Sequence, residues 1–428
     1  MQHRAAGPQA LTINRHTLHI FRHDPVASQK QLSMPPAGGA SLHGSLKVPH
    51  DAGRTLTATP MIVAEGVSCV FGTREQDALA MARAGESRAT ILDRTGTVIA
   101  LNDVGLRVDE GELVVVMGLS GSGKSTLLRC LNRLVTPSRG SIRVAGQEVT
   151  AMGARELREF RRRTFGMVFQ HFALFPHRTV LENVEFGLEV QGVARTARRR
   201  SAETALDLVG LAGWEDKRLG QLSGGMKQRA GLARALAADA SILLMDEAFS
   251  ALDPLIRRDM QGELVALQRR LRKTIVFVSH DLDEAIALGG RIALMMDGAI
   301  VQDGTAESIL AAPATPYVAR FVEHIDVSGV LRVGTLADRD APPPPGQRAS
   351  LQADMTLREA LPLLASEPDG LPVLDAAGRH LGVLWRTAAL SALARSHTAL
   401  GPQKEQPAWT SPSLDSRSTT YATAHSTG

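Results

Sequence analysis

The chain has 428 residues, 44% of them hydrophobic, and its 48 basic and 44 acidic residues leave a formal net charge of +4. This length allows two domains and at least one large core. The small net charge gives no indication of a nucleic-acid partner, and no apolar run approaches the roughly 18 to 20 residues of a membrane-spanning helix. Cys69 and Cys130 lack the spacing of metal ligands, so we expect both to be reduced and buried, as is usual in a cytosolic protein.

Residues 1–60 show little hydrophobic periodicity and are rich in Gly, Pro, Ser and His, which predicts a disordered N-terminal extension. Six of the 13 histidines lie here, but their spacing is irregular and no cysteine joins them, which argues against a metal site. The composition also resembles a transit peptide, although it lacks a sustained amphipathic run. An alternative start is Met61, which directly precedes the first strand-like run, IVAEGVSCVFG.

That strand-like run ends near Phe71, an aromatic residue that can stack on an adenine ring in a nucleotide site. The alternative for Phe71 is a place in the ordinary core. Two short helices, 74–84 and 87–94, are predicted next because a glycine closes each helical pattern. A strand-rich stretch, 98–108, then leads to a glycine-rich segment.

The glycine-rich segment LVVVMGLSGSGKST (113–126) combines a buried strand, a loop and the start of a helix predicted to run to Leu134. Its G-x-x-G-x-G-K-S spacing lets backbone N–H groups close on the oxygens of a polyphosphate, and the positive end of the helix dipole faces the same anion. Lys124 would reach the β- and γ-phosphates, Ser125 would offer its hydroxyl to Mg²⁺, and Thr126 would contact the α-phosphate side. The predicted nucleotide-binding residues are Gly118, Leu119, Ser120, Gly121, Ser122, Gly123, Lys124, Ser125 and Thr126.

Beyond this loop the patterns predict an arginine-rich helix with a solvated face through 157–163 and a buried strand, FGMVFQ, at 165–170. The next segment, HFALFPHRTVLENVEFGL at 171–188, is too apolar for an ordinary exposed loop and indicates a docking surface. A helical region follows from Val180 to about Val209, with a break near Gly192. In LSGGMKQRAGLARAL (222–236) a serine and two glycines precede a further helix and offer its N-terminus to an anion, which is a weak signal when taken alone.

Two later strands end in polar side chains. The strand in SILLMDE (241–247) leads to Asp246, which suits Mg²⁺ coordination through water, and to Glu247, which suits orienting or deprotonating an attacking water. The strand TIVFV (274–278) leads to Ser279 and His280. Because ligands bind at the carboxyl ends of strands in a parallel sheet, we expect these strand ends to converge on one crevice.

The ordered set GLSGSGKST (118–126), Gln170, LSGGMKQR (222–229), ILLMDE (242–247), SALD (250–253) and His280 resembles an ATP-binding cassette (ABC) ATPase. The segments LNRLVTPSRG, MVFQHFALFPHRTV, LSGGMKQRAGLARALA, LLMDEAFSALDPLIRRDMQGEL and TIVFVSHDLDEA more closely resemble the ATPase subunits of bacterial importers for glycine betaine, proline betaine and choline. The helical insertion before the glycine-rich loop is similar to theirs too. The resemblance implies an α/β fold over residues 61–325: an ABC-type P-loop nucleotide-binding domain with a helical subdomain.

In such cassettes two subunits meet head to tail, and each ATP lies between the phosphate-binding loop of one subunit and the signature LSGG segment of the other. The resemblance also implies that Gln170 reports ATP to the apolar segment after it, which receives the membrane subunit. The implied roles are catalysis for Glu247, His280 and Gln170, Mg²⁺ binding for Ser125, Gln170 and Asp246, and nucleotide contact or linkage across the dimer for Phe71, Ser223, Gly224, Gly225 and Asp253.

The resemblance further implies ATP and Mg²⁺ as cofactors. The implied partners are a second ATPase subunit, integral membrane permease subunits and a periplasmic or extracellular solute-binding protein, with no nucleic acid. The chain would lie peripherally on the cytoplasmic face of the bacterial inner membrane, where closing and reopening of the dimer would drive the permease between two states. Two alternatives stay open: an importer ATPase for an amino acid or a sulfonate, and a non-transport cassette ATPase acting on DNA or ribosomes. The second is disfavoured because such proteins usually carry two cassettes or long coiled-coil insertions.

Residues 326–395 predict a small α+β region, with a helical pattern at 355–364 that Pro362 interrupts and a strand–turn–strand in GLPVLDAAGRHLGVL (370–384). This region is similar to one cystathionine-β-synthase-type (CBS) repeat, and the run APPPPG (341–346) stands where a first copy would be needed. Regulation by ionic strength or nucleotide and a degenerate dimerisation appendage are both compatible with a single repeat. Residues 396–428 are polar and rich in Ser and Thr, which predicts a disordered tail.

Overall fold

The structure is a computed structural model that describes residues 59–343, 349–367 and 370–397. The extension predicted for residues 1–60 and the tail predicted for residues 396–428 lie almost entirely outside the described residues. Within the described part of the chain, no helix is both long and apolar enough to cross a membrane.

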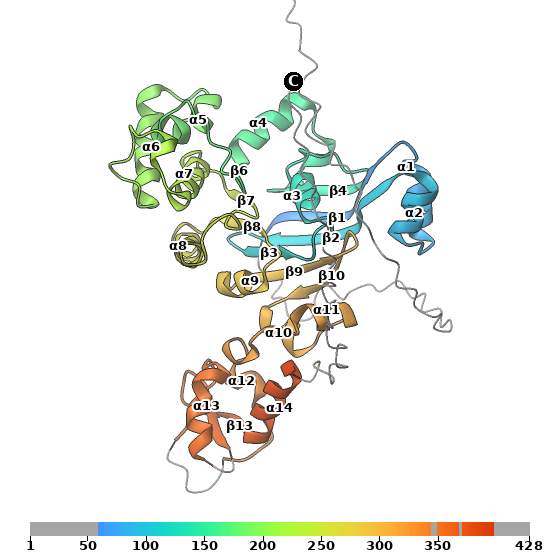
Figure 1. The fold of residues 1–428 in the computed structure, drawn as a ribbon, viewed down its shortest axis with the longest axis vertical. Coiled ribbons are helices and arrows are strands. Elements are labelled where there is room, and N and C mark those ends of the chain that lie inside the picture. Colours follow the sequence, from blue (N-terminus) through green and yellow to red (C-terminus); the bar gives the residue numbers. More distant parts are fainter. Residues whose placement is uncertain (1–58, 344–348, 368–369, 398–428) are drawn as a thin grey trace, which may run out of the picture. The chain divides into compact units, whose positions relative to one another are not determined.

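Six strands form the central sheet, in the order β10-β9-β3-β8-β7-β6 (Figure 1). All neighbouring pairs are parallel except β9 and β10, which pair antiparallel. Every residue of β3 and β8 is buried, as expected for apolar, β-branched strands that are covered on both faces. The strands are β3 (Leu113–Met117), β6 (Phe165–Phe169), β7 (Ile242–Asp246), β8 (Thr274–Val278), β9 (Arg291–Met296) and β10 (Ala299–Gly304).

Helices cover both faces of this sheet. Alternate side chains of β3 point to opposite sides, so Val114 and Val116 share a core with α3, whereas Val115 and Met117 share a core with α8 and α9. These helices are α3 (Lys124–Leu131), α8 (Pro254–Leu271) and α9 (Leu282–Leu288).

Helix α3 ends at Leu131, earlier than the predicted end at Leu134. The side-chain oxygen of Asn132 accepts a hydrogen bond from the backbone N–H of Leu134 at 3.1 Å, and Arg133 adopts a left-handed conformation with a φ of 54°. The side-chain-to-backbone bond of Asn132 competes with a further helical turn, which is the physical reason for the early end.

A second, antiparallel sheet packs on the other side of α3, in the order β2-β1-β4-β5. Its core brings together Cys69 of β1 and Cys130 of α3, which are both buried and hydrogen-bonded to each other. This hydrogen bond lowers the pKa of Cys69 and raises the pKa of Cys130. The strands are β1 (Pro60–Phe71), β2 (Val98–Asp109), β4 (Arg139–Val144) and β5 (Gln147–Glu148).

The two predicted insertion helices are present as α1 (Glu75–Arg83) and α2 (Arg88–Thr95). The Ser87 side chain caps α2 by accepting a hydrogen bond from the N–H of Thr90 at 3.1 Å. Gly96, in the left-handed conformation, ends the same helix, as predicted.

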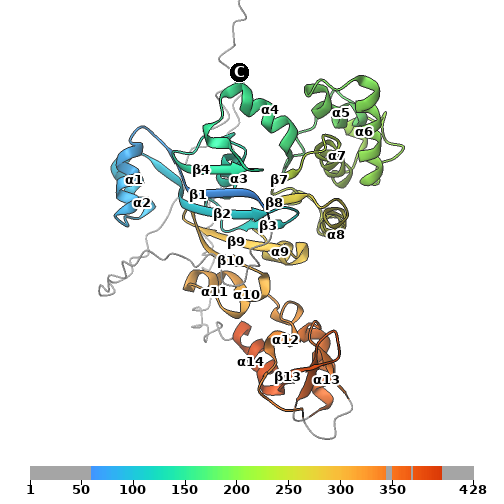
Figure 2. The same cartoon turned by 180° about the vertical axis from the view of Figure 1, so that it is seen from behind.

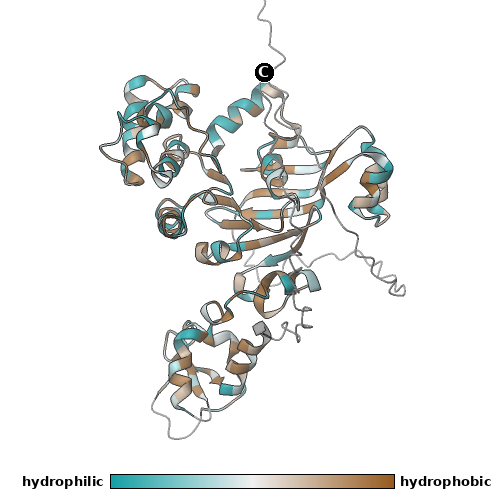
Figure 3. Cartoon of the chain, viewed as in Figure 1, coloured by the Kyte–Doolittle hydropathy of each residue, from teal (hydrophilic) through white to brown (hydrophobic). Residues whose placement is uncertain are grey.

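A helical subdomain is built from α5, α6 and α7, which share one buried core and form a group of their own in both views (Figures 1 and 2). The predicted break near Gly192 separates α5 from α6. The arginine-rich α4 is largely hydrophilic in Figure 3. Only Leu157 and Thr164 of this helix are buried, which confirms its solvated face. The helices are α4 (Ala154–Thr164), α5 (Val180–Val190), α6 (Arg195–Leu208) and α7 (Gly224–Ala237).

The C-terminal region contains a three-stranded sheet in the order β11-β12-β13, in which β11 is parallel and β13 antiparallel to β12. The predicted strand–turn–strand is confirmed as β12 and β13, while part of the APPPPG run lies outside the described residues. The elements after β10 are α10 (Ala306–Ala311), α11 (Pro316–Val322), α12 (Val333–Leu336), β11 (Leu351–Gln352), α13 (Leu357–Ser366), β12 (Leu371–Leu374), β13 (His380–Leu384) and α14 (Arg386–His397).

The predicted interruption of the helix by Pro362 is wrong, because α13 continues through this residue. Thr356 and Glu359 form a capping box that starts the helix. Leu357 and Leu364, which lie on either side of the proline, are both buried in the core of this region. Tertiary packing therefore outweighs the one backbone hydrogen bond that proline removes.

Candidate active site

The loop 118–126, here called the phosphate loop, joins β3 to α3 and depends on glycine for its shape. A Cβ atom on Gly118 would lie 2.2 Å from the carbonyl oxygen of Met295, and one on Gly123 would lie 2.5 Å from that of Ala100. Both glycines also have positive φ angles, of 143° and 106°. The backbone of the loop is therefore pressed against β2 and β9, while a Cβ on Gly121 would meet nothing within 4 Å.

Lys124 is the first residue of α3 and is only 5% exposed. Its Nζ donates hydrogen bonds to the carbonyl oxygens of Gly118 at 2.9 Å and Leu119 at 3.0 Å, so the ammonium lies within the curve of the loop. Burial lowers the pKa of Lys124, while the negative charges of Glu247 and Asp246 act in the opposite direction. A buried cation surrounded by backbone suits an anionic ligand.

The other predicted loop residues differ in exposure. Leu119, Ser120 and Gly121 are exposed at the tip of the loop, and Ser122 is buried. The Ser122 hydroxyl has no hydrogen-bond partner within the described residues. Thr126, in the first turn of α3, is half-buried.

Ser125 and Asp246 are brought together from distant parts of the chain. The Ser125 hydroxyl donates a hydrogen bond to Asp246 Oδ1 at 2.8 Å, and Arg129 Nη2 lies 3.6 Å from Asp246 Oδ2. Hydroxyl and carboxylate oxygens are the donors that Mg²⁺ prefers, so these two residues fit a Mg²⁺ site. Gln170 follows Phe169, which pairs directly with Asp246 in the parallel register of β6 and β7, so it stands at the same end of the sheet.

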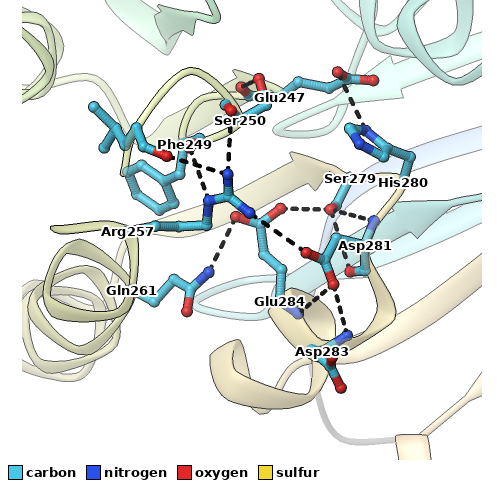
Figure 4. Close-up of polar contacts among 11 residues, drawn as sticks. Glu247, Phe249, Ser250, Arg257, Gln261, Ser279, His280, Asp281, Asp283 and Glu284 are labelled. Atoms are coloured by element: carbon cyan, nitrogen blue, oxygen red, sulfur yellow. Dashed lines mark hydrogen bonds and ion pairs between the residues drawn. The ribbon is translucent and has the colours of Figure 1, made fainter. Parts of the chain in front are cut away.

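Glu247 and His280 face each other across the ends of β7 and β8 (Figure 4). His280 Nδ1 lies 3.3 Å from Glu247 Oε2. The backbone N–H of Glu247 donates to the carbonyl oxygen of Val278 at 3.1 Å, and its φ of 47° lies in the left-handed region, which is strained for a glutamate. Such a backbone persists only where the surrounding structure holds it in place.

The expectation that strand ends converge is confirmed by the sheet order. β3, β8, β7 and β6 are consecutive and parallel, so their carboxyl ends meet at one edge. The residues that follow them are the phosphate loop, His280, Glu247 and Gln170 respectively.

Five predicted residues lie elsewhere. Phe71, at the end of β1, is 48% exposed, so it is not an ordinary core residue and its ring remains accessible. Ser223 caps α7 by accepting a hydrogen bond from the N–H of Met226 at 3.3 Å, with Gly224 and Gly225 in the first turn of that helix. No hydrogen bond among the described residues joins Ser223, Gly224 or Gly225 to the phosphate loop. Asp253 is exposed and caps α8 through the N–H of Leu255 at 3.0 Å.

The predicted docking segment after Gln170 is half-exposed. Phe175 stacks edge-on against Phe186 of α5, with ring centroids 4.6 Å apart, and the guanidinium of Arg178 lies over both rings. Beside it, β6, α5 and α7 line an open cavity of about 360 Å³ whose lining is mainly apolar and includes Met167, Phe175 and Phe186.

Two groups of functional neighbours were missed from the sequence. Arg88 of the insertion donates a hydrogen bond to the carbonyl oxygen of Gly121 in the phosphate loop at 3.2 Å. Arg257, Asp281 and Glu284 form a polar network beneath Glu247 and His280 (Figure 4). The only local signal was the pattern Asp281-x-x-Glu284, which is typical of a helix N-terminus.

A family model described as "ABC transporter" matches residues 101–250. The glycine betaine transport ATP-binding protein OpuAA of Bacillus subtilis (strain 168) is 54% identical over 278 residues, which cover 65% of this chain and 66%, or about two thirds, of that protein. The trimethylamine N-oxide transport system ATP-binding protein TmoW of Ruegeria pomeroyi (strain ATCC 700808 / DSM 15171 / DSS-3) is 45% identical over 339 residues, which cover 79% of this chain and 98% of that protein. A solved structure of cbiO1 from Clostridium perfringens, part of the ABC transporter complex cbiONQ, is 24% identical with a TM-score of 0.50 over 62% of this chain and 94% of that chain, which shows a shared fold.

Proposed function

We propose, because this chain belongs to the ATP-binding proteins of ABC transporters, that it hydrolyses ATP to energise a membrane importer for glycine betaine and similar quaternary ammonium solutes. The main support for ATP hydrolysis is the contact of Ser125 with Asp246 and of Glu247 with His280 at one edge of the central sheet. Both contacts join residues that the chain separates widely.

ATP would be held mainly by the phosphate loop. The N–H groups of the loop and the positive end of α3 face the phosphates, and Lys124 neutralises charge on the β- and γ-phosphates. The exposed ring of Phe71 would stack on the adenine.

Mg²⁺ would be bound by Ser125 and Asp246, with Gln170 at the same strand ends. When bound, the ion supplies charge neutralisation between the phosphate oxygens. Glu247 would accept a proton at its carboxylate from the water that attacks the γ-phosphate. His280 Nδ1 faces Glu247, so its Nε2 would be the nitrogen that contacts the γ-phosphate.

A second copy of the chain would complete each site. Ser223, Gly224 and Gly225 present a helix N-terminus without any hydrogen bond to the phosphate loop among the described residues, which supports a role on the ATP of a partner subunit. Asp253 is exposed, stands six residues after Glu247 in the chain, and would link the two sites across that dimer.

The apolar segment after Gln170 and its neighbouring cavity would receive a permease subunit of the membrane. The chain would then lie on the cytoplasmic face of the membrane, and a periplasmic or extracellular binding protein would deliver the solute. The closing and reopening of the dimer would shift the permease between its two states.

Uptake by cells tests the transport function. Cells that carry Lys124→Ala in this chain should lose uptake of radiolabelled glycine betaine or choline, because the phosphate loop loses its only buried cation among the described residues. Lys217→Ala, which changes an exposed lysine, serves as the matched control and should transport normally. Normal uptake of every such solute by the Lys124→Ala cells would contradict the proposed solute class.

A second candidate solute is trimethylamine N-oxide. The match with TmoW covers 98% of the length of TmoW, which belongs to a trimethylamine N-oxide transport system. The same cells distinguish the two candidates. Uptake of trimethylamine N-oxide without uptake of glycine betaine, lost in Lys124→Ala, would favour this second assignment.

The C-terminal region would act as a CBS-like regulatory element. Its support is the sequence resemblance together with the βαββα order of β11, α13, β12, β13 and α14. Uptake measured with and without an osmotic upshift tests this role, since a sensing element makes uptake depend on the upshift. Uptake that is equal under both conditions favours a dimerisation appendage.

A further inference from the structure

Arg257 lies in the first turn of α8, and its guanidinium turns back onto the loop that follows Glu247 (Figure 4). Its Nε donates a hydrogen bond to the carbonyl oxygen of Phe249 at 3.2 Å, and its Nη2 donates to those of Ser250 and Leu252, each at 3.2 Å. The planar guanidinium presents its donors in fixed directions, so one side chain holds three backbone carbonyls of this loop in one geometry.

The same guanidinium reaches the segment that carries His280. Its Nη1 lies 3.6 Å from Asp281 Oδ2, and Asp281 directly follows His280 in the chain. Oδ1 of Asp281 accepts hydrogen bonds from the N–H groups of Asp283 at 3.0 Å and Glu284 at 3.3 Å, which fixes Asp281 at the start of α9.

Buried polar side chains next to this contact join α8 to α9. Gln261, one turn after Arg257, donates a hydrogen bond to Glu284 Oε1 at 3.2 Å. The Ser279 hydroxyl contacts the other oxygen of Glu284 and accepts a hydrogen bond from the N–H of Asp281 at 3.0 Å. The position of Arg257 relative to Asp281 is therefore well defined.

The start of α8 does not depend on Arg257. Asp253 already caps this helix and Pro254 occupies its first position, which is favourable for a helix start. The contacts of Arg257 thus serve the two loops rather than the helix that carries it.

We propose that Arg257 is a positioning residue for ATP hydrolysis: it links the loop between Glu247 and α8 to the His280–Asp281 segment and so maintains the 3.3 Å approach of His280 to Glu247. The strained backbone of Glu247, with its φ of 47°, needs such external restraint. The same link joins Asp253, the proposed contact across the dimer, to the catalytic pair of its own subunit. This inference rests on the proposed ATPase function.

The test measures ATP hydrolysis by the purified full-length protein. Arg257→Met should lower kcat by about 10- to 100-fold, because displacement of a reacting group by about 1 Å can cost that much. The KM for ATP should stay within about 2-fold, since the phosphate loop is unchanged. Arg258→Met, which changes the neighbouring exposed arginine on the same helix, is the matched control and should leave kcat unchanged.

Two further variants separate positioning from a merely structural role. Asp281→Asn removes the charge that faces Arg257 but retains a good helix cap, so a smaller loss of kcat is expected without loss of stability. In the double variant Glu247→Gln/Arg257→Met, the second change should add almost nothing to the first, because a residue that acts through Glu247 has no further effect once Glu247 is replaced. Fully additive losses would overturn the proposal.

The possible failures are distinguishable. If the unchanged protein binds ATP but does not hydrolyse it, the proposed function fails rather than this inference. If the protein hydrolyses ATP and Arg257→Met has the kcat of Arg258→Met, the inference is wrong. Should Arg257→Met fail to fold, kcat is measured for Arg257→Lys and Asp281→Asn instead. An unchanged kcat in both variants would overturn the proposal.

Discussion

His280 Nδ1 lies 3.3 Å from Glu247 Oε2, although the two residues follow different strands, β8 and β7. The parallel pairing of Asp246 with Val278 brings them together, because Glu247 stands one residue and His280 two residues beyond this last pair of the ladder. The imidazole therefore restrains the carboxylate that we propose as the base, and the two side chains act as one unit.

Replacement of Glu247 by Gln should leave ATP binding intact and lower hydrolysis by roughly 10²- to 10⁴-fold, or about 3 to 5 kcal/mol in the activation barrier. The amide keeps the size of the side chain but does not accept a proton from water. Phosphate release and nucleotide titration on the same preparation check both parts. Turnover at the unchanged rate would contradict the assignment of Glu247 as base.

The Glu247→Gln variant should also form a stable dimer in the presence of ATP, because slow hydrolysis leaves the proposed closed state populated. Adding Ser223→Arg should abolish this dimer, since a large cation would replace the helix cap at the start of α7. Size-exclusion chromatography with light scattering, with ATP and with ADP, checks this prediction. An ATP-dependent dimer that persists in the double variant would exclude the LSGG segment from the interface.

Gly123→Ala should destabilise the phosphate loop and prevent ATP binding. The new Cβ would lie 2.5 Å from the carbonyl oxygen of Ala100, and the φ of 106° is unfavourable for alanine. The matched control is Gly262→Ala in the exposed interior of α8, where a Cβ meets nothing within 4 Å. That change should raise the free energy of unfolding by roughly 0.5 to 1 kcal/mol. Urea unfolding and nucleotide titration of both variants check the contrast, which fails if Gly123→Ala binds ATP normally.

Removal of the Ser125 hydroxyl should weaken the binding of Mg²⁺ at its proposed site. Ser125→Ala deprives Asp246 of its 2.8 Å hydrogen bond and the ion of one ligand, so the Mg²⁺ concentration for half-maximal hydrolysis should rise by about 10- to 100-fold. A chelator should stop hydrolysis in the unchanged protein. Ser201→Ala, an exposed serine on α6, is the control, and an equal Mg²⁺ requirement in both variants would contradict the ligand assignment.

Glu284 should make stability fall as the pH rises. Burial raises the pKa of Glu284 above its ordinary value of 4.5, with the hydrogen bonds of Ser279 and Gln261 opposing this shift. The folded state then holds the proton more tightly than the unfolded state, so the stabilising contribution of protonated Glu284 is complete below pH 4.5 and is lost as the pH rises through the raised pKa. Urea unfolding of the unchanged protein and of Glu284→Gln between about pH 4 and 8 checks the sign: the stability advantage of the unchanged protein over the variant should shrink with rising pH.

Much of the architecture was predictable because it depends on local physics. Consecutive β-branched residues in Leu113–Met117 indicate a strand that is buried on both faces, and the glycines after it permit backbone angles that other residues avoid. The helix caps at Ser87 and Ser223 are likewise signals within a few residues of the chain.

The errors arose where a local rule competed with another contact. Helix α3 stops before Leu134 because the side chain of Asn132 takes a backbone N–H, and α13 passes through Pro362 because Leu357 and Leu364 are buried on both sides of it. The contact of Cys69 with Cys130 depends on the packing of β1 against α3, which no spacing in the sequence indicates.

The sequence by itself determined which chemical groups this protein carries and on which elements they stand: a phosphate loop between strand and helix, and carboxylates and a histidine at strand ends. These follow from residue type and from contacts within a few positions. Only the tertiary structure decided how those groups meet. The 2.8 Å contact of Ser125 with Asp246, the 3.3 Å contact of Glu247 with His280 and the link through Arg257 depend on strand register and helix packing, which are set by side chains far apart in the chain.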